Sequence, residues 1–126
     1  MTRKLTFLFI AVLFMSACKK DHGEAPDTEP PVIQLNSPSN HQTVGVNQNF
    51  AVTALVSDNK RVEEIHLEII NTTSNAFIAH EHFTADGPSY NLARSFALAA
   101  GTFQIKVEAD DDSGNNAEAE VTVTVR

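Results

Sequence analysis

The sequence predicts an all-β domain in which two antiparallel sheets pack face to face as a sandwich of about seven strands. Three observations carry this prediction. Apolar residues recur with a period of two in several short segments, which is typical of strands with one buried and one solvated face. Clusters of turn-forming residues separate these segments, and no segment shows the apolar stripe of an amphipathic helix.

The first three strands are expected in the N-terminal half of the domain. Residues 32–35 form a short apolar segment that ends at a turn containing proline, and residues 50–56 place alternate apolar side chains on one face. Residues 62–69 continue the pattern after a turn. Their apolar positions shift by one at Glu63 and Glu64, which predicts a β-bulge or a late start of this strand.

Two further strands are predicted in the middle of the domain. Residues 77–83 alternate weakly and follow the polar turn 71–75. Residues 90–98 begin after the turn-forming sequence 86–88 and end at the turn 100–101. The spacing of these segments is that of an antiparallel sandwich, in which short strands alternate with turns.

The last two strands form the clearest pattern in the chain. Residues 103–109 alternate strictly between apolar and polar side chains, and residues 117–125 do the same. The seven residues between them, 110–116, are Asp, Ser, Gly and Asn, which favour turns. The sequence therefore predicts a β-hairpin that closes the domain.

An apolar segment at the N-terminus predicts a lipoprotein signal peptide over residues 1–17. Arg3 and Lys4 provide a positive start, and the apolar run that follows is too short to cross a hydrocarbon core of about 30 Å. Small residues lead into Cys18, the only cysteine of the chain, and this sequence resembles the lipobox of bacterial lipoproteins. Lipid attachment at Cys18 would leave no thiol for a disulfide, a zinc site or a nucleophile.

A flexible tether is expected over residues 18–29, because this segment is polar and contains no large apolar residue. The ordered domain is expected over residues 30–126. The formal net charge of −7 argues against nucleic-acid binding, because neutralising phosphates requires clustered Lys and Arg. Residues 19–21 resemble surface-export signals of Bacteroidota lipoproteins, which predicts an outer-membrane location and leaves exposure on the cell surface open.

Three short sequences resemble bacterial immunoglobulin-like domains: residues 30–33, 56–59 and 109–115. The Cys and Trp core of antibody domains is absent, so the likeness is to the fibronectin-III and cadherin side of that architecture. Together with the lipobox, the chain resembles the Bacteroidota lipoproteins grouped as domain of unknown function family 4625. The resemblance implies an immunoglobulin-like fold, and the activity of that family is itself unknown.

Acidic and amide side chains gather in turns that an immunoglobulin-like sandwich brings to one end. They are Asp58, Asn59, Asp110, Asp111, Asp112 and Asn115, with Glu63 or Glu64 nearby. Such oxygen ligands suit Ca²⁺, although the spacing is not that of an EF-hand. The alternative is that these side chains cap the turns by bonding to their own backbone, with Gly114 supplying a positive φ.

Three histidines form a second candidate metal site. His80 and His82 are two residues apart on a predicted strand and therefore face the same side. If this strand pairs antiparallel with the preceding one, His66 can meet one of them, and three imidazoles suit Zn²⁺, Ni²⁺ or Cu²⁺. The alternative is that all three are solvated residues on an exposed sheet face.

No motif of a hydrolase, metalloprotease or nucleotide-binding enzyme occurs in the sequence. Arg94 lies at an inward position of its strand and is expected to sit at an edge with its charged group in water. We therefore expect a non-catalytic, lipid-anchored binding or assembly module of the cell envelope, with an envelope protein or a glycan as partner. A metal-binding module is the alternative, and an accessory domain of an envelope enzyme system is a further one.

Overall fold

The computed structural model describes residues 23–126, and all regular secondary structure in this part is β-strand, as predicted. The strands are β1 (Val32–Ser37), β2 (Gln42–Val44), β3 (Phe50–Asn71), β4 (Phe77–Phe96), β5 (Gly101–Asp111) and β6 (Asn116–Val125). No helix in the described part has the length and apolar composition needed to cross a membrane. The predicted signal peptide and Cys18 lie outside the described residues.

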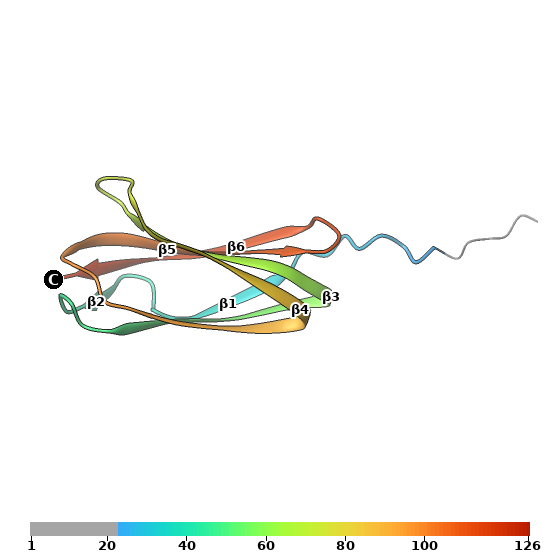
Figure 1. The fold of residues 1–126 in the computed structure, drawn as a ribbon, viewed down its shortest axis with the longest axis horizontal. Helices are drawn as coiled ribbons and strands as arrows, with labels where there is room; N and C mark the ends of the chain where they lie inside the picture. Colours follow the sequence, from blue (N-terminus) through green and yellow to red (C-terminus); the bar gives the residue numbers. More distant parts are fainter. Residues whose placement is uncertain (1–22) are drawn as a thin grey trace, which may run out of the picture.

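The strands form two layers, and the long strands β3 and β4 run from one layer into the other (Figure 1). In the first layer, residues 50–57 of β3 pair with β1 on one side and with residues 89–96 of β4 on the other. In the second layer, residues 62–71 of β3 lie between β5 and the first half of β4. β6 pairs with β5 and completes the sandwich.

The described residues form six strands rather than about seven, because two pairs of predicted strands are continuous and one further strand, β2, was not predicted. The segments 50–56 and 62–69 both belong to β3, and the segments 77–83 and 90–98 fall largely in β4. Between them the pairing of β3 with β4 shifts register, so the chain bends there. The two strands are paired on both sides of the bend, from Ser57 opposite Ser89 to Val62 opposite Gly87, so the predicted turns occur as a bend within continuous strands.

β2 is a short strand that the sequence pattern does not reveal, and it makes the one parallel pairing among the described strands. It pairs with β6, with Gln42 opposite Val123. A hydrogen bond from the N–H of His41 to the carbonyl of Thr122, 2.7 Å long, precedes this ladder. β2 thus covers the edge of β6, which would otherwise present unpaired backbone groups.

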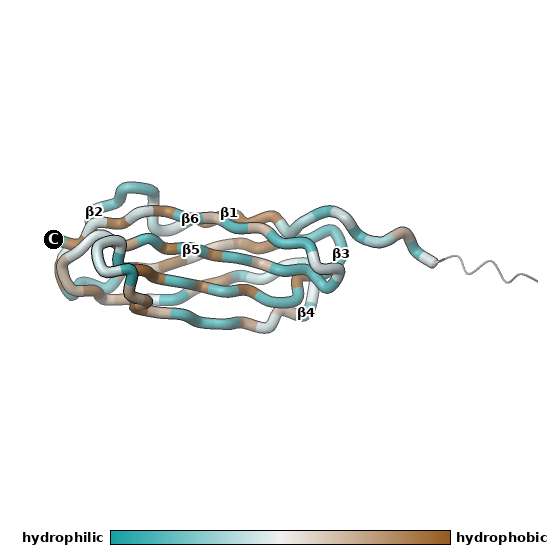
Figure 2. Tube along the Cα trace, turned by 90° about the horizontal axis from the view of Figure 1, so that it is seen from above, coloured by the Kyte–Doolittle hydropathy of each residue, from teal (hydrophilic) through white to brown (hydrophobic). Residues whose placement is uncertain are grey.

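The core lies between the two layers and follows the period-two pattern. The largest fully buried apolar side chains include Val52, Val56, Val62, Ile65, Leu67, Ile69, Ile105, Val107 and Val123. Figure 2 shows apolar and polar residues alternating along the strands. The predicted offset after Val62 is present: the register shifts between Val62 and Glu64 on both neighbouring strands. This bulge lets Val62 and Ile65 both face the core while His66 faces outward.

Candidate metal centres

Three carboxylates from distant parts of the sequence meet at the end of the sandwich where the N-terminal segment enters (Figure 1). Asp58 lies in the bend of β3, and Asp111 is the last residue of β5. Asp27 belongs to the segment before β1. One carboxylate oxygen from each of the three lies within 4.8 Å of the others.

Asp111 is buried, with 1% of its surface exposed, because it continues the inward-facing alternation of β5. Its Oδ1 accepts hydrogen bonds from the N–H groups of Ser113 (2.9 Å) and Asn115 (2.7 Å), and its Oδ2 accepts one from Asn115 Nδ2 (2.6 Å). Burial opposes ionisation, but these hydrogen bonds outweigh it and hold the pKa of Asp111 below its ordinary value. The cluster therefore contains a charged carboxylate inside the protein.

Asp58 and Asp27 each accept hydrogen bonds at Oδ1, Asp58 from within the bend of β3 and Asp27 from Asn59 in the same bend. Oδ1 of Asp58 accepts from the N–H groups of Lys60 (2.8 Å) and Arg61 (2.7 Å), and Oδ1 of Asp27 accepts from Asn59 Nδ2 (3.1 Å). The Oδ2 atoms of both aspartates are buried and have no hydrogen-bond partner. A buried polar atom without a partner costs about 1–3 kcal/mol.

Further contacts hold the N-terminal segment against this end of the sandwich. Glu24 forms an ion pair with Lys60 (3.0 Å), and the backbone carbonyl of Asp27 accepts a hydrogen bond from Asn115 Nδ2 (3.2 Å). Asp27 and Glu24 lie in the segment expected to be a flexible tether. Sequence reasoning missed Asp27 because a polar segment without periodicity gives no indication of what it contacts.

The other acidic residues proposed for Ca²⁺ lie elsewhere. Asp110 alternates with Asp111 and faces outward, where it accepts a hydrogen bond from Asn116 Nδ2 (2.9 Å). Asp112 is exposed in the β5–β6 turn, in which Gly114 has a φ of +88°. The structure thus brings Asp58, Asp111 and Asn115 together at the cluster and leaves Asp110 and Asp112 out of it.

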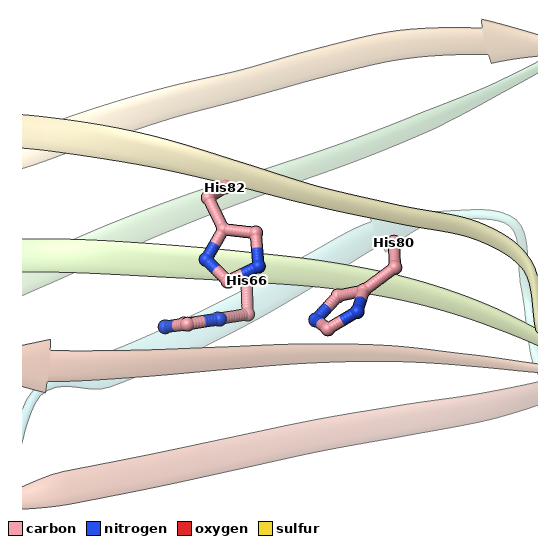
Figure 3. A group of neighbouring side chains, drawn as sticks. All are labelled: His66, His80 and His82. Carbon is pink, nitrogen blue, oxygen red and sulfur yellow. The ribbon is translucent and has the colours of Figure 1, made fainter.

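The three histidines meet on the outward face of the second layer (Figure 3). His66 on β3 lies directly opposite His82 on β4, as the expected antiparallel pairing requires. The ring centroids of His66 and His82 are 4.2 Å apart, those of His80 and His82 are 4.6 Å apart, and those of His66 and His80 are 6.4 Å apart. One ring nitrogen from each lies within 4.8 Å of the other two.

Carboxylates surround the histidines. Glu64 reaches two of them, with Oε2 at 3.5 Å from Nε2 of His66 and Oε1 at 3.2 Å from Nδ1 of His82. Oε1 of Glu68 lies 3.5 Å from Nε2 of His80. The ammonium group of Lys106 lies 2.8 Å from Oε2 of Glu68, and this hydrogen bond raises the pKa of Lys106 above its ordinary value.

Arg94 lies at the β4 edge of the sandwich, as expected, and its guanidinium group is partly exposed. It forms two parallel hydrogen bonds with Glu81, of 2.5 Å from Nε and 2.8 Å from the terminal nitrogen. The two residues lie on halves of β4 that belong to different layers, so the ion pair links the layers at their edge. The described residues enclose no pocket.

Comparison with solved structures confirms the fold class. The chain is similar to the fibronectin(III)-like modules of CbhA from Clostridium thermocellum, with a TM-score of 0.51 and 18% identity over 75% of this chain and 94% of the module. It is also similar to the CARDB domain of a Pyrococcus furiosus protein, solved in complex with di-metal ions (TM-score 0.49, 15% identity, 77% of this chain and 86% of that one). A third similarity is to a β-glucosidase from Listeria innocua, at a TM-score of 0.42 and 14% identity, covering 75% of this chain and 16% of the enzyme.

Comparison with curated protein sequences gives no match. A family model described as "Domain of unknown function (DUF4625)" matches residues 16–126, which is most of this chain.

Proposed function

For this chain, which belongs to the DUF4625 family, we propose the role of a non-catalytic binding or assembly module of the cell envelope, anchored by a lipid on Cys18 and stiffened at its anchored end by Ca²⁺. The fibronectin-III-like fold supports a module of this kind. The Ca²⁺ site is formed by Asp27, Asp58 and Asp111. The Ca²⁺ site and the lipid anchor are tested by separate experiments.

The observation that carries the Ca²⁺ site is the pair of buried Oδ2 atoms, on Asp27 and Asp58, that have no hydrogen-bond donor. With Asp111 they bring three carboxylates within 4.8 Å, which is unfavourable for like charges without a cation. The site offers oxygen ligands from three separate segments. This donor set suits Ca²⁺, which accepts irregular oxygen coordination more readily than Mg²⁺ does.

A cation at this point would join the N-terminal segment, the bend of β3 and the β5–β6 turn. Asp27 lies nine positions after Cys18 in the sequence. Ca²⁺ binding would therefore leave only a short stretch of chain between the lipid and the fixed end of the sandwich. The domain would then be held near the outer membrane by a tether of nine residues, whose reach of about 3.3–3.6 Å per residue limits the distance between the sandwich and the lipid.

The end far from the N-terminal segment is the proposed contact surface for an envelope partner. There the β3–β4 hairpin projects beyond the second layer (Figure 1). Phe77 and Ile78 follow its turn and are 58% and 48% exposed. Exposed large apolar side chains at the free end of an anchored module suit contact with another protein.

The Ca²⁺ proposal is tested by calorimetric titration and thermal unfolding of the full chain in detergent. We expect one Ca²⁺ per chain and a higher unfolding temperature in Ca²⁺ than in EDTA. Asp112→Asn is the matched control, because it removes an aspartate from the same end without touching the cluster. Absence of both heat and thermal shift at millimolar Ca²⁺ would reject the site.

The anchor is tested by labelling cells with palmitate. The wild-type chain should carry the label and fractionate with the outer membrane, and Cys18→Ala should lose it. An unlabelled wild type, or a labelled Cys18→Ala chain, would contradict the lipid anchor and leave the Ca²⁺ site unaffected.

A further inference from the structure

The outward face of β3 and β4 carries three imidazoles that no part of the Ca²⁺ proposal uses. We propose that His66, His80 and His82 bind one divalent transition-metal ion of the Zn²⁺, Cu²⁺ and Ni²⁺ class, with Glu64 as the fourth ligand. The site is separate from the Asp27 cluster: His66 alternates with the core-facing residues of β3 and lies on the outer face of its layer. It would give the module a second metal with different chemistry.

The paired backbones of β3 and β4 hold the Cα atoms of the three histidines close together. His66 and His82 are directly cross-strand neighbours, and His80 is two residues from His82 on the same face. A paired sheet holds such positions more firmly than a loop does. The ligand nitrogens are within 4.8 Å of one another, whereas two nitrogens on one tetrahedral Zn²⁺ are about 3.4 Å apart. Closing this difference requires side-chain rotation only.

The exposure of the side chains permits that rotation. The side chain of His66 is the most enclosed, at 21% exposed, while those of His80 and His82 are 44% and 50% exposed. The two more exposed imidazoles can therefore turn toward a metal bound by the more enclosed His66. The rings are already close neighbours: the centroid distance is 4.2 Å for the edge-on pair His66 and His82 and 4.6 Å for the tilted pair His80 and His82.

The surrounding groups match what a metal-binding imidazole requires. Glu64 lies between His66 and His82, at 3.5 and 3.2 Å, so its carboxylate can complete the coordination. Glu68 contacts Nε2 of His80 and is itself held by Lys106, which fits a carboxylate that orients a metal ligand. Nitrogen ligands with one carboxylate favour Zn²⁺, Cu²⁺ or Ni²⁺ over Ca²⁺.

The test is calorimetric titration of the full chain in detergent with ZnCl₂, after removal of metal with a chelator. We expect one Zn²⁺ per chain for the wild type. The dissociation constant of His66→Gln and that of His82→Gln should each be at least tenfold larger than that of the wild type. His41→Asn is the matched control, since His41 lies in the loop before β2 with a φ of +62°, which Asn tolerates. Its affinity should equal that of the wild type.

A second measurement separates ligation from a structural effect. Electron paramagnetic resonance of the chain loaded with one Cu²⁺ should show coupling to several imidazole nitrogens, and fewer in His82→Gln. Circular dichroism without metal should be the same for all variants. No Zn²⁺ binding by the wild type, or equal binding by the wild type and both glutamine variants, would overturn the proposal. The two metal sites can be tested independently of each other, because Asp58→Asn should leave Zn²⁺ binding unchanged.

Discussion

The effect of Asp58→Asn on thermal stability should change sign when Ca²⁺ is added: the substitution should stabilise the protein without Ca²⁺ and destabilise it, relative to the wild type, with Ca²⁺. The substitution keeps Oδ1, which accepts from the N–H groups of Lys60 and Arg61, so the bend of β3 is preserved. It replaces the unpartnered Oδ2 with a donor that can bond to the carboxylates of Asp27 or Asp111. Without metal, the variant therefore loses a buried charge and gains a hydrogen bond.

The size of the effect follows from these groups. Relief of one unpartnered buried oxygen is worth about 1–3 kcal/mol. For a domain of roughly 100 residues, about 1 kcal/mol shifts the unfolding temperature by about 4–8 °C. In EDTA, the variant should thus unfold at least about 4 °C above the wild type. In Ca²⁺ at about 1,000 times the dissociation constant, the wild type should gain about 4.1 kcal/mol, which the variant does not gain and which exceeds the variant's advantage in EDTA.

The assay is thermal unfolding of both chains, followed by circular dichroism in EDTA and in Ca²⁺. The expected result is a change of order: Asp58→Asn is the more stable chain in EDTA and the less stable one in Ca²⁺. Asp112→Asn should respond to Ca²⁺ as the wild type does. If Asp58→Asn were the less stable chain in both buffers, or gained as much from Ca²⁺ as the wild type, the reasoning would be refuted.

Three further outcomes test the fold. Leu67→Ala should lower the free energy of unfolding in urea by about 2–5 kcal/mol, because Leu67 is fully buried; a loss below about 1 kcal/mol would contradict this packing. Gly114→Ala should cost about 1 kcal/mol in the same assay, since φ is +88° but nothing lies within 4 Å of the added methyl group. The hydrogen bond from Arg94 lowers the pKa of Glu81 from 4.5, so the pair stabilises the fold above that pH and loses its effect as the pH falls through the lowered value. Glu81→Gln should therefore unfold at a lower temperature than the wild type near pH 7 and at a similar one near pH 2, and a difference independent of pH would count against the ion pair.

The sequence by itself determined the fold class and the direction of most side chains. The turn predicted from residue 110 begins later in the structure, since β5 continues to Asp111 and buries it. The strict alternation in residues 103–109, by contrast, correctly determined which side chains of that strand face the core. The same holds for the bulge after Val62, because a change in the parity of apolar positions is visible without any partner strand. Alternation also placed His80 and His82 on one face.

Only the tertiary structure decided which of these faces meet. His66 lies opposite His82 because of the register between β3 and β4, and register depends on pairing along the whole length of both strands. The parallel contact of β2 with β6 and the convergence of Asp27 with Asp58 and Asp111 join residues far apart in the sequence. A local pattern records which way a side chain points, whereas the choice of partner follows from how the layers pack. For this reason the candidate ligands were visible in the sequence, except Asp27. The histidine site could be predicted only on the condition that the two strands pair antiparallel, and the membership of the aspartate cluster required the tertiary structure.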